Sequence, residues 1–292
     1  MFEVVNKLIL TEGIKRLDIR APRVAKNVKA GQFVSVCCEE GDERVPLTVV
    51  DCDRAKGIIS LIFHEAGATT KKLGALPINE SLFSILGPLG NPATIERKGE
   101  VVCIATGIAS AQILPIARAL RQAGNKVIGV IGAKTKKKLM LEAQMRVACE
   151  KIFITTEDGS YERRGLATDV LRQLLQTRDI QLVYAIGSAE MMEAVCEMTK
   201  KKKIKTLVQL NPMMVDCMGM CGSCRVRIGG KTVLVCTDGP EFNGHQVDFK
   251  DYKIRLNAFE GHNQWQGQKL QQLSQRNESV TFRRFLSGIL KE

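Results

Sequence analysis

The stretch Val101-Val102-Cys103-Ile104-Ala105-Thr106-Gly107-Ile108-Ala109-Ser110-Ala111 decides the fold of the middle of this chain. It opens with an uninterrupted apolar run, turns at Gly107 and continues into a segment, 109–122, whose apolar residues recur at helical spacing. A buried strand, a short turn and an amphipathic helix are the first half of a βαβ unit. The sequence therefore predicts a parallel sheet here.

The same alternation continues toward the carboxyl end, as far as residue 210. We predict strands at 101–105, 126–131, 151–155, 182–186 and 206–210. Between them we predict helices at 109–122, 136–149, 168–176 and 190–201. Strands that alternate with helices usually pair in parallel, with helices on both faces of the sheet. Residues 97–210 are therefore expected to form an α/β domain.

Residues 1–96 carry a different pattern, typical of an all-β domain. Short apolar segments recur, and Gly, Asp and Glu turn residues separate them at 2–9, 14–19, 32–37, 47–52 and 58–63. Regular short strands with turn signals favour an antiparallel barrel or a sandwich. Gly87-Pro88-Leu89-Gly90-Asn91-Pro92 then interrupts the chain, and we place the first domain boundary after it.

Composition restricts the classes of function. The chain has 292 residues, 45% of them hydrophobic, which is enough for about two domains with full cores. The net charge of +12 suits anionic nucleotides or an acidic partner. Aromatic residues make up only 5% and do not interleave with a basic stripe, so nucleic-acid binding is not indicated. We see neither a signal peptide nor a stretch of roughly 20 apolar residues, and expect a cytoplasmic protein without a membrane span.

Four of the ten cysteines, Cys217, Cys221, Cys224 and Cys236, lie within one Gly-rich segment, 211–250. This segment is too short for a large core, and a bound metal would substitute for one. In a reducing compartment, clustered cysteines indicate metal rather than disulfides. Plant-type [2Fe-2S] sites use a C-x4-C-x2-C…C spacing. We therefore expect this segment to bind a [2Fe-2S] cluster.

The first ligand departs from that spacing. Counting back from Cys221, the x4 gap falls on Asp216 rather than on Cys217. Cys217 would give an x3 gap, which a loop adjustment of one residue would permit, so it stays the alternative. A tetrahedral zinc site is a further alternative, although zinc motifs usually pair two C-x2-C knuckles and only one is present. The ligands that we assign are Asp216, Cys221, Cys224 and Cys236.

Two stretches of the β domain have the residue types that hold a flavin pyrophosphate. Arg44-Val45-Pro46-Leu47-Thr48 places an Arg and a hydroxyl on one strand, and Gly67-Ala68-Thr69-Thr70 opens a helix. An Arg, hydroxyl donors and backbone amides held close together bind phosphate well. By themselves these residues fit an ordinary edge strand and helix cap at least as well. The flavin-binding candidates are Arg44, Pro46, Leu47, Thr48, His64, Gly67, Thr69 and Thr70.

Strand ends in the α/β domain supply candidate nucleotide contacts, because ligands bind at the carboxyl ends of parallel strands. Thr106 and Gly107 follow the first strand, Asp158 follows the third, and Gly187 follows the fourth. At the first of these loops a dinucleotide phosphate would meet a helix N-terminus. Arg163-Arg164, on the same loop as Asp158, would contact phosphate or simply face solvent.

With these residues together, the chain resembles the ferredoxin–NADP reductase superfamily over about residues 1–250. It is similar to the small subunits of NADH-dependent reduced ferredoxin:NADP oxidoreductase, also called sulfide dehydrogenase beta subunits. The electron-transfer subunits of dihydroorotate dehydrogenase are close relatives. The flavin motif R-x-P-[LI]-[ST] is matched at 44–48, the second flavin loop at 67–70, a Gly-Pro-Leu-Gly turn at 87–90 and Asn-Pro-Met-Met-Val-Asp at 211–216. The D-x4-C variant resembles the first group more than the dihydroorotate group, which uses a first Cys.

The resemblance implies an FAD-binding β-barrel at 1–96, an NAD(P)-binding α/β domain at 97–210, a [2Fe-2S] segment at 211–250 and a tail at 251–292. It implies an oxidoreductase subunit that moves electrons between NAD(P)H, FAD and the cluster, with no acid or base residue required. It also implies a heterodimer with a larger flavin- and iron–sulfur-containing subunit, through which ferredoxin reacts. The tail has apolar residues at roughly helical spacing, at 270, 273, 282, 285, 286 and 289, and we assign it no chemistry.

The nucleotide contacts depart from the family pattern. The family loop is typically G-G-G-x-G-x-A-P, whereas this chain has Ala105-Thr106-Gly107-Ile108-Ala109-Ser110-Ala111-Gln112. The usual Gly-Pro after the fourth strand is Gly187-Ser188 here. Nucleotide binding is therefore expected to be weakened, altered or handed to a partner. Two further interpretations stay open: a dihydroorotate dehydrogenase electron-transfer subunit, and a non-enzymatic redox or iron sensor.

Overall fold

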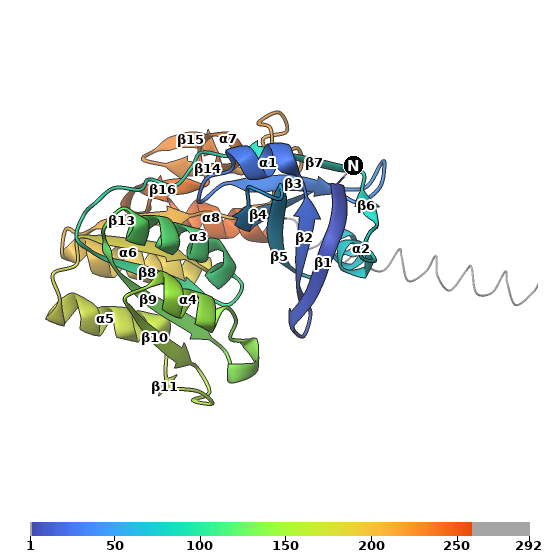
Figure 1. Ribbon diagram of the computed structural model, residues 1–292. Helices are drawn as coiled ribbons and strands as arrows, with labels where there is room; N and C mark the ends of the chain where they lie inside the picture. The colour runs from blue at the N-terminus through green and yellow to red at the C-terminus, as the bar shows by residue number, and fades with distance from the viewer. Residues whose placement is uncertain (1, 259–292) are drawn as a thin grey trace, which may run out of the picture. The chain divides into compact units, whose positions relative to one another are not determined.

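The computed structural model describes residues 2–258, and its first sheet confirms the antiparallel β-barrel. Seven strands pair in the order β6-β1-β2-β5-β4-β3-β7, all antiparallel (Figure 1). They are β1 (Phe2–Thr11), β2 (Ile14–Arg20), β3 (Phe33–Cys37), β4 (Val45–Asp53), β5 (Ile58–His64), β6 (Ser81–Leu82) and β7 (Ser84–Leu89).

The barrel nearly closes because its two edge strands are consecutive in the chain. Only Phe83 separates β6 from β7, and its amide donates to the carbonyl of Cys38 beyond β3 (2.9 Å). Two short helices, α1 (Pro22–Asn27) and α2 (Ala68–Ala75), connect strands. Alternate strand residues point inward to a buried core that includes Val4, Leu17, Ile19, Val34, Val36, Leu47, Ile59, Leu61 and Phe63.

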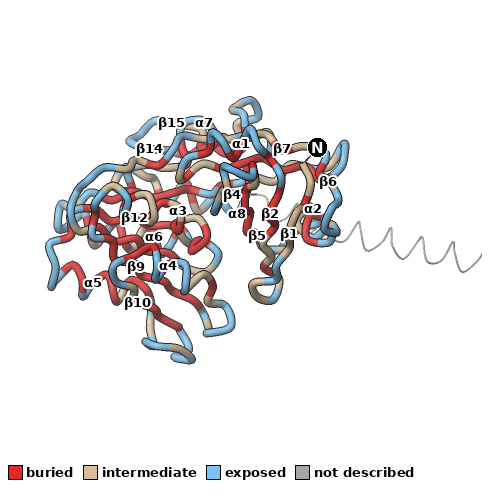
Figure 2. The backbone as a smooth tube through the Cα atoms, viewed as in Figure 1, coloured by how far each residue is buried: buried red, intermediate tan, exposed pale blue. Residues whose placement is uncertain are grey.

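The second sheet is parallel, as the alternation predicted. Its order is β11-β10-β9-β8-β12-β13-β16, and only β16 runs antiparallel. The central strands are buried on both faces, which explains their continuous apolar sequences (Figure 2). The strands are β8 (Glu100–Thr106), β9 (Lys126–Ala133), β10 (Lys151–Thr156), β11 (Arg163–Arg164), β12 (Leu182–Ile186), β13 (Lys205–Gln209) and β16 (Glu241–Asn243).

Helices cover both faces of this sheet. α3 (Ala109–Gln122) packs with α4 (Glu142–Ala148), and α5 (Ala167–Thr177) packs with α6 (Ala189–Lys201). The α3 helix begins and ends at the predicted residues. Its buried side chains, with those of β8, β9 and β12, form a second hydrophobic core, which also includes Ile14, Val50 and Ile62 of the barrel strands.

The single helix predicted at 136–149 is wrong. The chain forms a one-turn 3-10 helix, η1 (Lys136–Lys138), and α4 starts only at Glu142. Between them Leu141 adopts a left-handed backbone conformation (φ 59°), which a continuous α-helix does not permit. Met140 in the same break is buried in the core, so packing outweighs helical propensity there.

The Cys-rich segment has little regular structure of its own and packs on the parallel sheet. It contains a hairpin of β14 (Arg225–Ile228) and β15 (Lys231–Leu234), then α7 (Val235–Asp238) and η2 (Gly244–Gln246). Its strand β16 pairs with β13, so the segment extends the α/β sheet. The buried Tyr184 hydroxyl of β12 donates to Glu241 Oε2 of β16 (2.6 Å) and fixes that pairing.

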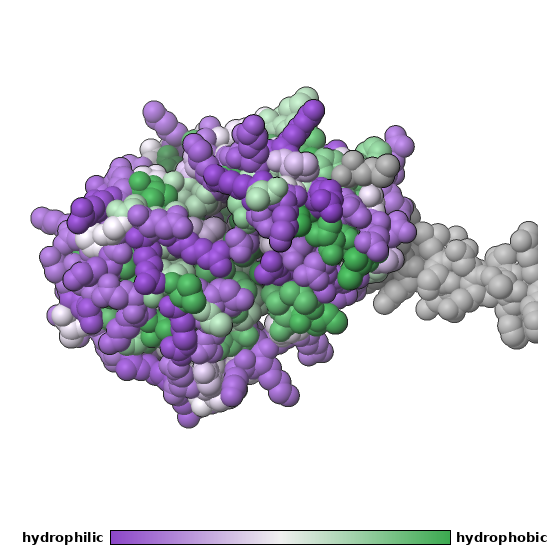
Figure 3. Space-filling model, viewed as in Figure 1, coloured by the Kyte–Doolittle hydropathy of each residue, from purple (hydrophilic) through white to green (hydrophobic). Residues whose placement is uncertain are grey.

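The last described element is the helix α8 (Phe249–Asn257). The apolar tail positions that we singled out lie outside the described residues. Within residues 2–258, no helix combines the length and the apolar character needed to cross a membrane. The face of the molecule drawn in Figure 3 is predominantly hydrophilic, with smaller apolar areas between the polar side chains.

Candidate functional site

A cavity of about 670 Å³ lies at the carboxyl ends of β8, β9, β10 and β12. The chain runs outward from β8 through β9 to β10, and then returns to the other side of β8 as β12 and β13. Open α/β sheets bind ligands at such a reversal of strand order. Two further walls come from elsewhere: Ile14 of the barrel, and Asn211 just beyond β13.

Three of the predicted nucleotide contacts, Thr106, Gly107 and Gly187, line this cavity. The Gly107 backbone is left-handed (φ 58°), and its amide donates to the carbonyl of Gly132 on β9 (2.9 Å). Gly187 lies close to Thr106, since a Cβ at 187 would be 2.6 Å from Thr106 Oγ1. The absence of a side chain at 187 therefore keeps the Thr106 hydroxyl accessible from the cavity.

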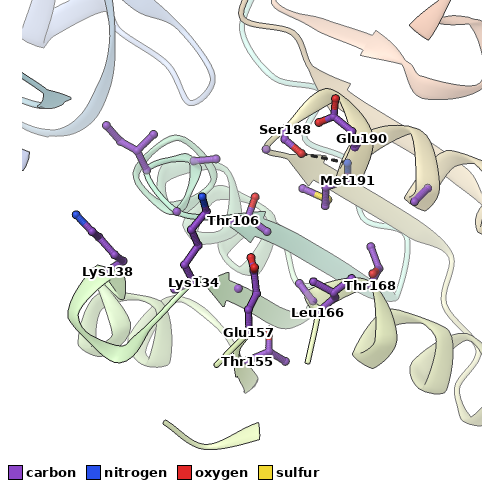
Figure 4. Close-up of a pocket in the computed structure, with 18 of the residues that line it drawn as sticks. Thr106, Lys134, Lys138, Thr155, Glu157, Leu166, Thr168, Ser188, Glu190 and Met191 are labelled. Atoms are coloured by element: carbon purple, nitrogen blue, oxygen red, sulfur yellow. Dashed lines mark hydrogen bonds between the residues drawn. The ribbon is translucent and has the colours of Figure 1, made fainter. Parts of the chain in front are cut away.

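The fourth candidate, Asp158, does not line the cavity, whereas its neighbour Glu157 does. The Asp158 carboxylate accepts hydrogen bonds from the amide (3.0 Å) and hydroxyl (2.7 Å) of Ser160, and these bonds lower its pKa. In Figure 4 the side chains of Thr106, Lys134 and Glu157, from the ends of three neighbouring strands, surround the same space. The cavity thus presents both a cation and a carboxylate.

The cavity also contains an unsatisfied donor. Thr155 Oγ1, near the end of β10, is buried and has no hydrogen-bond partner among residues 2–258. A buried hydroxyl without a partner costs about 1–3 kcal/mol, which a bound polar ligand would recover. The donor set and the location at the strand ends therefore fit a nucleotide.

The barrel brings the two flavin stretches to one end. Lys72 of α2 forms ion pairs with Glu39 (2.6 Å) and Asp42 (2.9 Å), in the loop that leads to Arg44. The helix α2 starts directly after Gly67, so the second flavin loop lies beside the first. At that loop the Gly67 amide donates to Thr70 Oγ1 (3.0 Å), and the Thr70 hydroxyl donates to the Gly67 carbonyl (3.1 Å).

Arg44 supplies the observation that tests the fit of FAD. Its Nη1 is buried and has no hydrogen-bond partner in the described chain. A guanidinium nitrogen in this state is a donor that a pyrophosphate oxygen would satisfy. The residues at this end of the barrel therefore fit FAD.

The other flavin candidates differ in orientation. Leu47 belongs to the barrel core, so its side chain faces away from any ligand outside the barrel and only its backbone can reach one. Pro46 and Thr48, one residue on either side, face the opposite way. His64 is exposed at the end of β5, opposite Ile14 of β2 in the strand register, and Ile14 is also the barrel's contribution to the cavity.

The cluster segment is organised around Asp216. Its Oδ1 accepts from the amide of Met218 (3.0 Å), and its Oδ2 accepts from the amides of Met220 and Cys221 (both 2.7 Å). Partial burial opposes ionisation, but these amides outweigh it and lower the pKa of the carboxyl. Asp216 is thus held as an anion at the centre of the loop that carries Cys221.

The cysteines divide into an exposed one and three buried ones. Cys221 is exposed, while Cys224 and Cys236 are buried and adjacent, the Cys236 amide donating to Cys224 Sγ (3.4 Å). Cys217 is buried, with a left-handed backbone (φ 63°), and its thiol lies near Ser35 of β3. Burial raises the pKa of the Cys217 thiol.

The donor set fits an iron–sulfur cluster. Three thiols and one carboxylate occur in the predicted spacing, and Gly219 and Gly222 have left-handed φ values (86° and 67°) that let amides turn inward. Within residues 2–258 no three His, Cys, Asp or Glu side chains already converge as metal ligands, and the carboxylate of Asp216 is turned to the loop amides. The residues are therefore grouped in one loop system without enclosing a common point.

Comparison with known proteins agrees with this assignment. The iron–sulfur cluster binding domain of dihydroorotate dehydrogenase B matches residues 211–248. Over 87% of this chain, a protein of Thermotoga maritima is 35% identical across 254 residues, which are 90% of its length; it is named dihydroorotate dehydrogenase B (NAD(+)), electron transfer subunit homolog. This chain belongs to that family of electron-transfer subunits.

Two further proteins are similar to this chain over most of its length. A protein of Clostridium beijerinckii, named only as an uncharacterized protein in the adh 3' region, is 38% identical over 267 residues, covering 88% of this chain and 90% of the relative. A solved chain of the NADH-dependent reduced ferredoxin-NADP oxidoreductase, described for flavin-based electron bifurcation, is 33% identical with a TM-score of 0.87. It covers 92% of this chain and 98% of that one.

Sequence reasoning missed several cavity residues of this electron-transfer subunit. Lys134 and Thr155 lie at the ends of β9 and β10, and Glu157 follows β10. Gln112 and Asn211 also line the cavity, but they come from a helix and from the chain beyond β13. The strand-end rule would have identified the first three if it had been applied to every predicted strand; the last two depend on tertiary contacts.

Proposed function

We propose that this electron-transfer subunit moves electrons between NAD(P)H, FAD and a [2Fe-2S] cluster, and on to a larger partner flavoprotein subunit of the ferredoxin:NADP oxidoreductase type. One observation carries the proposal. The cavity at the strand ends is walled by Ile14 of the barrel, so a nucleotide in it would abut the domain that carries the flavin motif. Cofactors would carry the electron chemistry, and the protein would orient them.

The chain's own residues have separable roles in this proposal. Arg44 and the 67–70 loop would hold the FAD pyrophosphate, and the orphaned Nη1 of Arg44 supports that role. Thr106, Gly107 and Gly187 would contact the nucleotide at the strand ends. Bound FAD would take electrons in pairs from the nicotinamide and release them singly to the cluster. No side chain needs to act as an acid or base.

The cluster would be held by Asp216, Cys221, Cys224 and Cys236. The thiols of Cys224 and Cys236 already lie side by side, and the Asp216 carboxylate is held ionised. Cys217 is the weaker candidate because its thiol lies against Ser35 of the barrel and gives an x3 rather than an x4 gap to Cys221. A carboxylate ligand would alter the cluster's potential relative to four thiolates.

The exposed residues around this loop would meet the partner subunit. Met220 is 84% exposed, Val215 55% and Met218 51%, although methionine and valine normally bury their side chains. Flexible Met side chains adapt well to partner surfaces. Ferredoxin would react through that partner. Partner capture from the native source, with the companion subunit identified, tests this arrangement.

In a second candidate function, this chain would be the electron-transfer subunit of a dihydroorotate dehydrogenase and would pair with its catalytic subunit. The name of the Thermotoga maritima relative favours it, while the D-x4-C spacing favours the ferredoxin:NADP type. The partner that co-purifies discriminates between them. Dihydroorotate oxidation by the recovered complex would support the second candidate.

The proposal is tested on the full chain purified without oxygen. We expect flavin absorbance, about two iron atoms per chain and an EPR signal of a reduced [2Fe-2S] cluster. Rapid mixing with NADH or NADPH should bleach the flavin. A colourless, iron-free protein would contradict the proposal, and a loaded protein that neither nucleotide reduces would favour the redox-sensor interpretation.

A further inference from the structure

An amide pair spans one end of the nucleotide cavity. Asn211 Nδ2 donates a hydrogen bond to Gln112 Oε1 (3.0 Å), and both residues line the cavity. Gln112 lies in the first turn of α3, and Asn211 follows β13 at the start of the cluster segment. The pair therefore joins two walls of the cavity that are far apart in the sequence.

This pair marks the end of the cavity that faces the barrel. Gln209 Nε2, two residues before Asn211, donates to the carbonyl of Gly31 in the barrel (3.2 Å). Ile14 adds the barrel's own side chain to the lining. Glu157, just after β10, and Thr168 of α5 line the part of the cavity that lies toward the β10 edge of the sheet, away from β13. A nucleotide that delivers electrons to the barrel must therefore place its reactive ring near Gln112 and Asn211.

The chemistry of the pair matches that ring. The carboxamide of nicotinamide is a planar primary amide with one carbonyl acceptor and one amino group that donates twice, like the side chains of Gln and Asn. Gln112 uses its carbonyl oxygen in the bond to Asn211, while its amino group makes no hydrogen bond within the described part of the chain. Nearby lining residues Ile14, Ile108 and Ala109 are apolar and offer no side-chain donor.

The sequence shows that Gln112 is a feature of this chain. The resemblance implies proline at this position of the family loop, and a proline side chain neither donates nor accepts hydrogen bonds. The same loop has lost glycines that usually let the backbone approach a dinucleotide. A polar contact at the reactive end would offset weaker contacts at the phosphates.

We propose that Gln112, positioned by Asn211, binds the carboxamide of the nicotinamide ring and sets that ring against the barrel. The inference rests on the proposed function, because it assumes that a nicotinamide nucleotide occupies the cavity. The Gln112 amino group would donate to the carboxamide oxygen, and Asn211 would keep the Gln112 amide plane fixed. No bond to the ring itself is formed or broken by either residue.

The test compares NADH with ADP-ribose, which lacks the nicotinamide ring, by calorimetry on the full FAD-loaded chain. We expect Gln112→Leu to weaken NADH binding about tenfold, the value of one neutral hydrogen bond, and to leave ADP-ribose binding unchanged. Gln122→Leu, at the far end of the same helix, is the matched control and should change neither. Gln112→Glu keeps the shape without the amino donor, should also weaken NADH, and serves if the leucine variant folds poorly.

Each outcome decides the matter. If both Gln112 variants lose NADH and ADP-ribose binding equally, Gln112 and Asn211 have only a structural role. If NADH binding is unchanged, Gln112 does not contact the nicotinamide. Either result overturns the inference. If the wild-type chain and the Gln112 variants bind NADH equally tightly, only this inference is refuted. A wild-type chain that binds neither NADH nor ADP-ribose refutes the proposed function as well.

Discussion

The nucleotide cavity and the cluster segment are built in opposite ways. The cavity lies at the ends of four buried strands, whose hydrogen-bonded ladder fixes where those ends lie. Residues 211–224 contain no helix or strand, and left-handed backbone conformations recur at Cys217, Gly219 and Gly222. A site made from regular structure is present before its ligand binds. A site made from a loop depends on side-chain contacts and on the metal itself.

Removal of a buried thiolate should have the largest effect, because a loop site has nothing to replace it. We expect Cys224→Ser to lose the iron and the EPR signal entirely. Cys52→Ser, in β4 of the barrel, is the matched control and should keep both. NADH binding should persist in Cys224→Ser, since the cavity is held by the sheet, and loss of NADH binding there would show that the two regions depend on one another.

The identity of the first cluster ligand, Asp216 or Cys217, can be tested in the same loop. Asp216→Ala should lose the cluster, because it removes a ligand and also the acceptor of three loop amides. Cys217→Ala should retain full iron content, with only a packing loss against the barrel. Iron analysis and EPR of both variants decide between them. If Cys217→Ala empties the site while Asp216→Ala stays loaded, the ligand is the cysteine.

A single methyl group should damage the cavity. In Gly187→Ala the new Cβ would lie 2.6 Å from Thr106 Oγ1 and would collide with Met191. Since both neighbours line the cavity, their displacement should weaken NADH binding at least tenfold, while overpacking costs about 1–3 kcal/mol of stability. Calorimetric titration with NADH measures the first effect and urea unfolding the second. Unchanged iron content would confirm that the cluster segment is unaffected.

Much of the fold could be predicted because its signals are local. The buried run of β12 at Leu182–Ile186 and the helix α3 at Ala109–Gln122 occur as predicted. The failure at 136–149 has a tertiary cause: Met140 is buried in the core and Leu141 adopts a left-handed conformation to place it there. The strand β16 was missed because three residues carry no periodicity, and it exists only by pairing with β13.

Only those site residues that belong to a sequence motif or follow a predicted strand could be predicted. Cys221 and Cys224 follow from a motif, and Thr106 from a strand end. Gln112 and Asn211 are almost a hundred positions apart and meet only when α3 packs on β8 and β12, so no local pattern reveals them. Asp158 and Glu157 differ by one residue, and only the backbone direction beyond β10 decides which one lines the cavity.

The dependence of the cluster segment on the sheet can be measured at Glu241. Its Oε2 accepts from the buried Tyr184 hydroxyl (2.6 Å) and from the amide of Thr94 (3.0 Å). Glu241→Ala leaves the Tyr184 hydroxyl without this partner, so we expect unfolding free energy to fall by about 1–3 kcal/mol. Urea unfolding measures the change, with Glu197→Ala on exposed α6 surface as control. Equal stability of both variants would mean that this bond does not anchor the segment.

The smallest effect is a pH dependence at His245, in the η2 turn that anchors the same segment. His245 Nε2 lies 3.0 Å from Thr199 Oγ1 of α6, and Thr199 accepts from Thr206 of β13 (2.6 Å). Burial, with a smaller contribution from Lys200, lowers the pKa of His245 below its ordinary 6.5. The unfolded chain therefore binds a proton before the folded one does, so stability is full above pH 6.5 and falls as the pH drops toward the folded-state pKa.

His245→Gln keeps a hydrogen-bonding side chain without the titration. We expect the melting temperature of the variant to fall less than that of the wild type between pH 7.0 and pH 5.5, a window chosen around the ordinary histidine pKa of about 6.5. The cavity takes its α6 residues from the first half of that helix, up to Ala194, whereas His245 contacts Thr199 near its end. NADH affinity should therefore show no matching difference between the two proteins. Parallel pH profiles of melting temperature would show that the folded protein accommodates the protonated ring without loss of stability, and that His245 does not anchor the cluster segment.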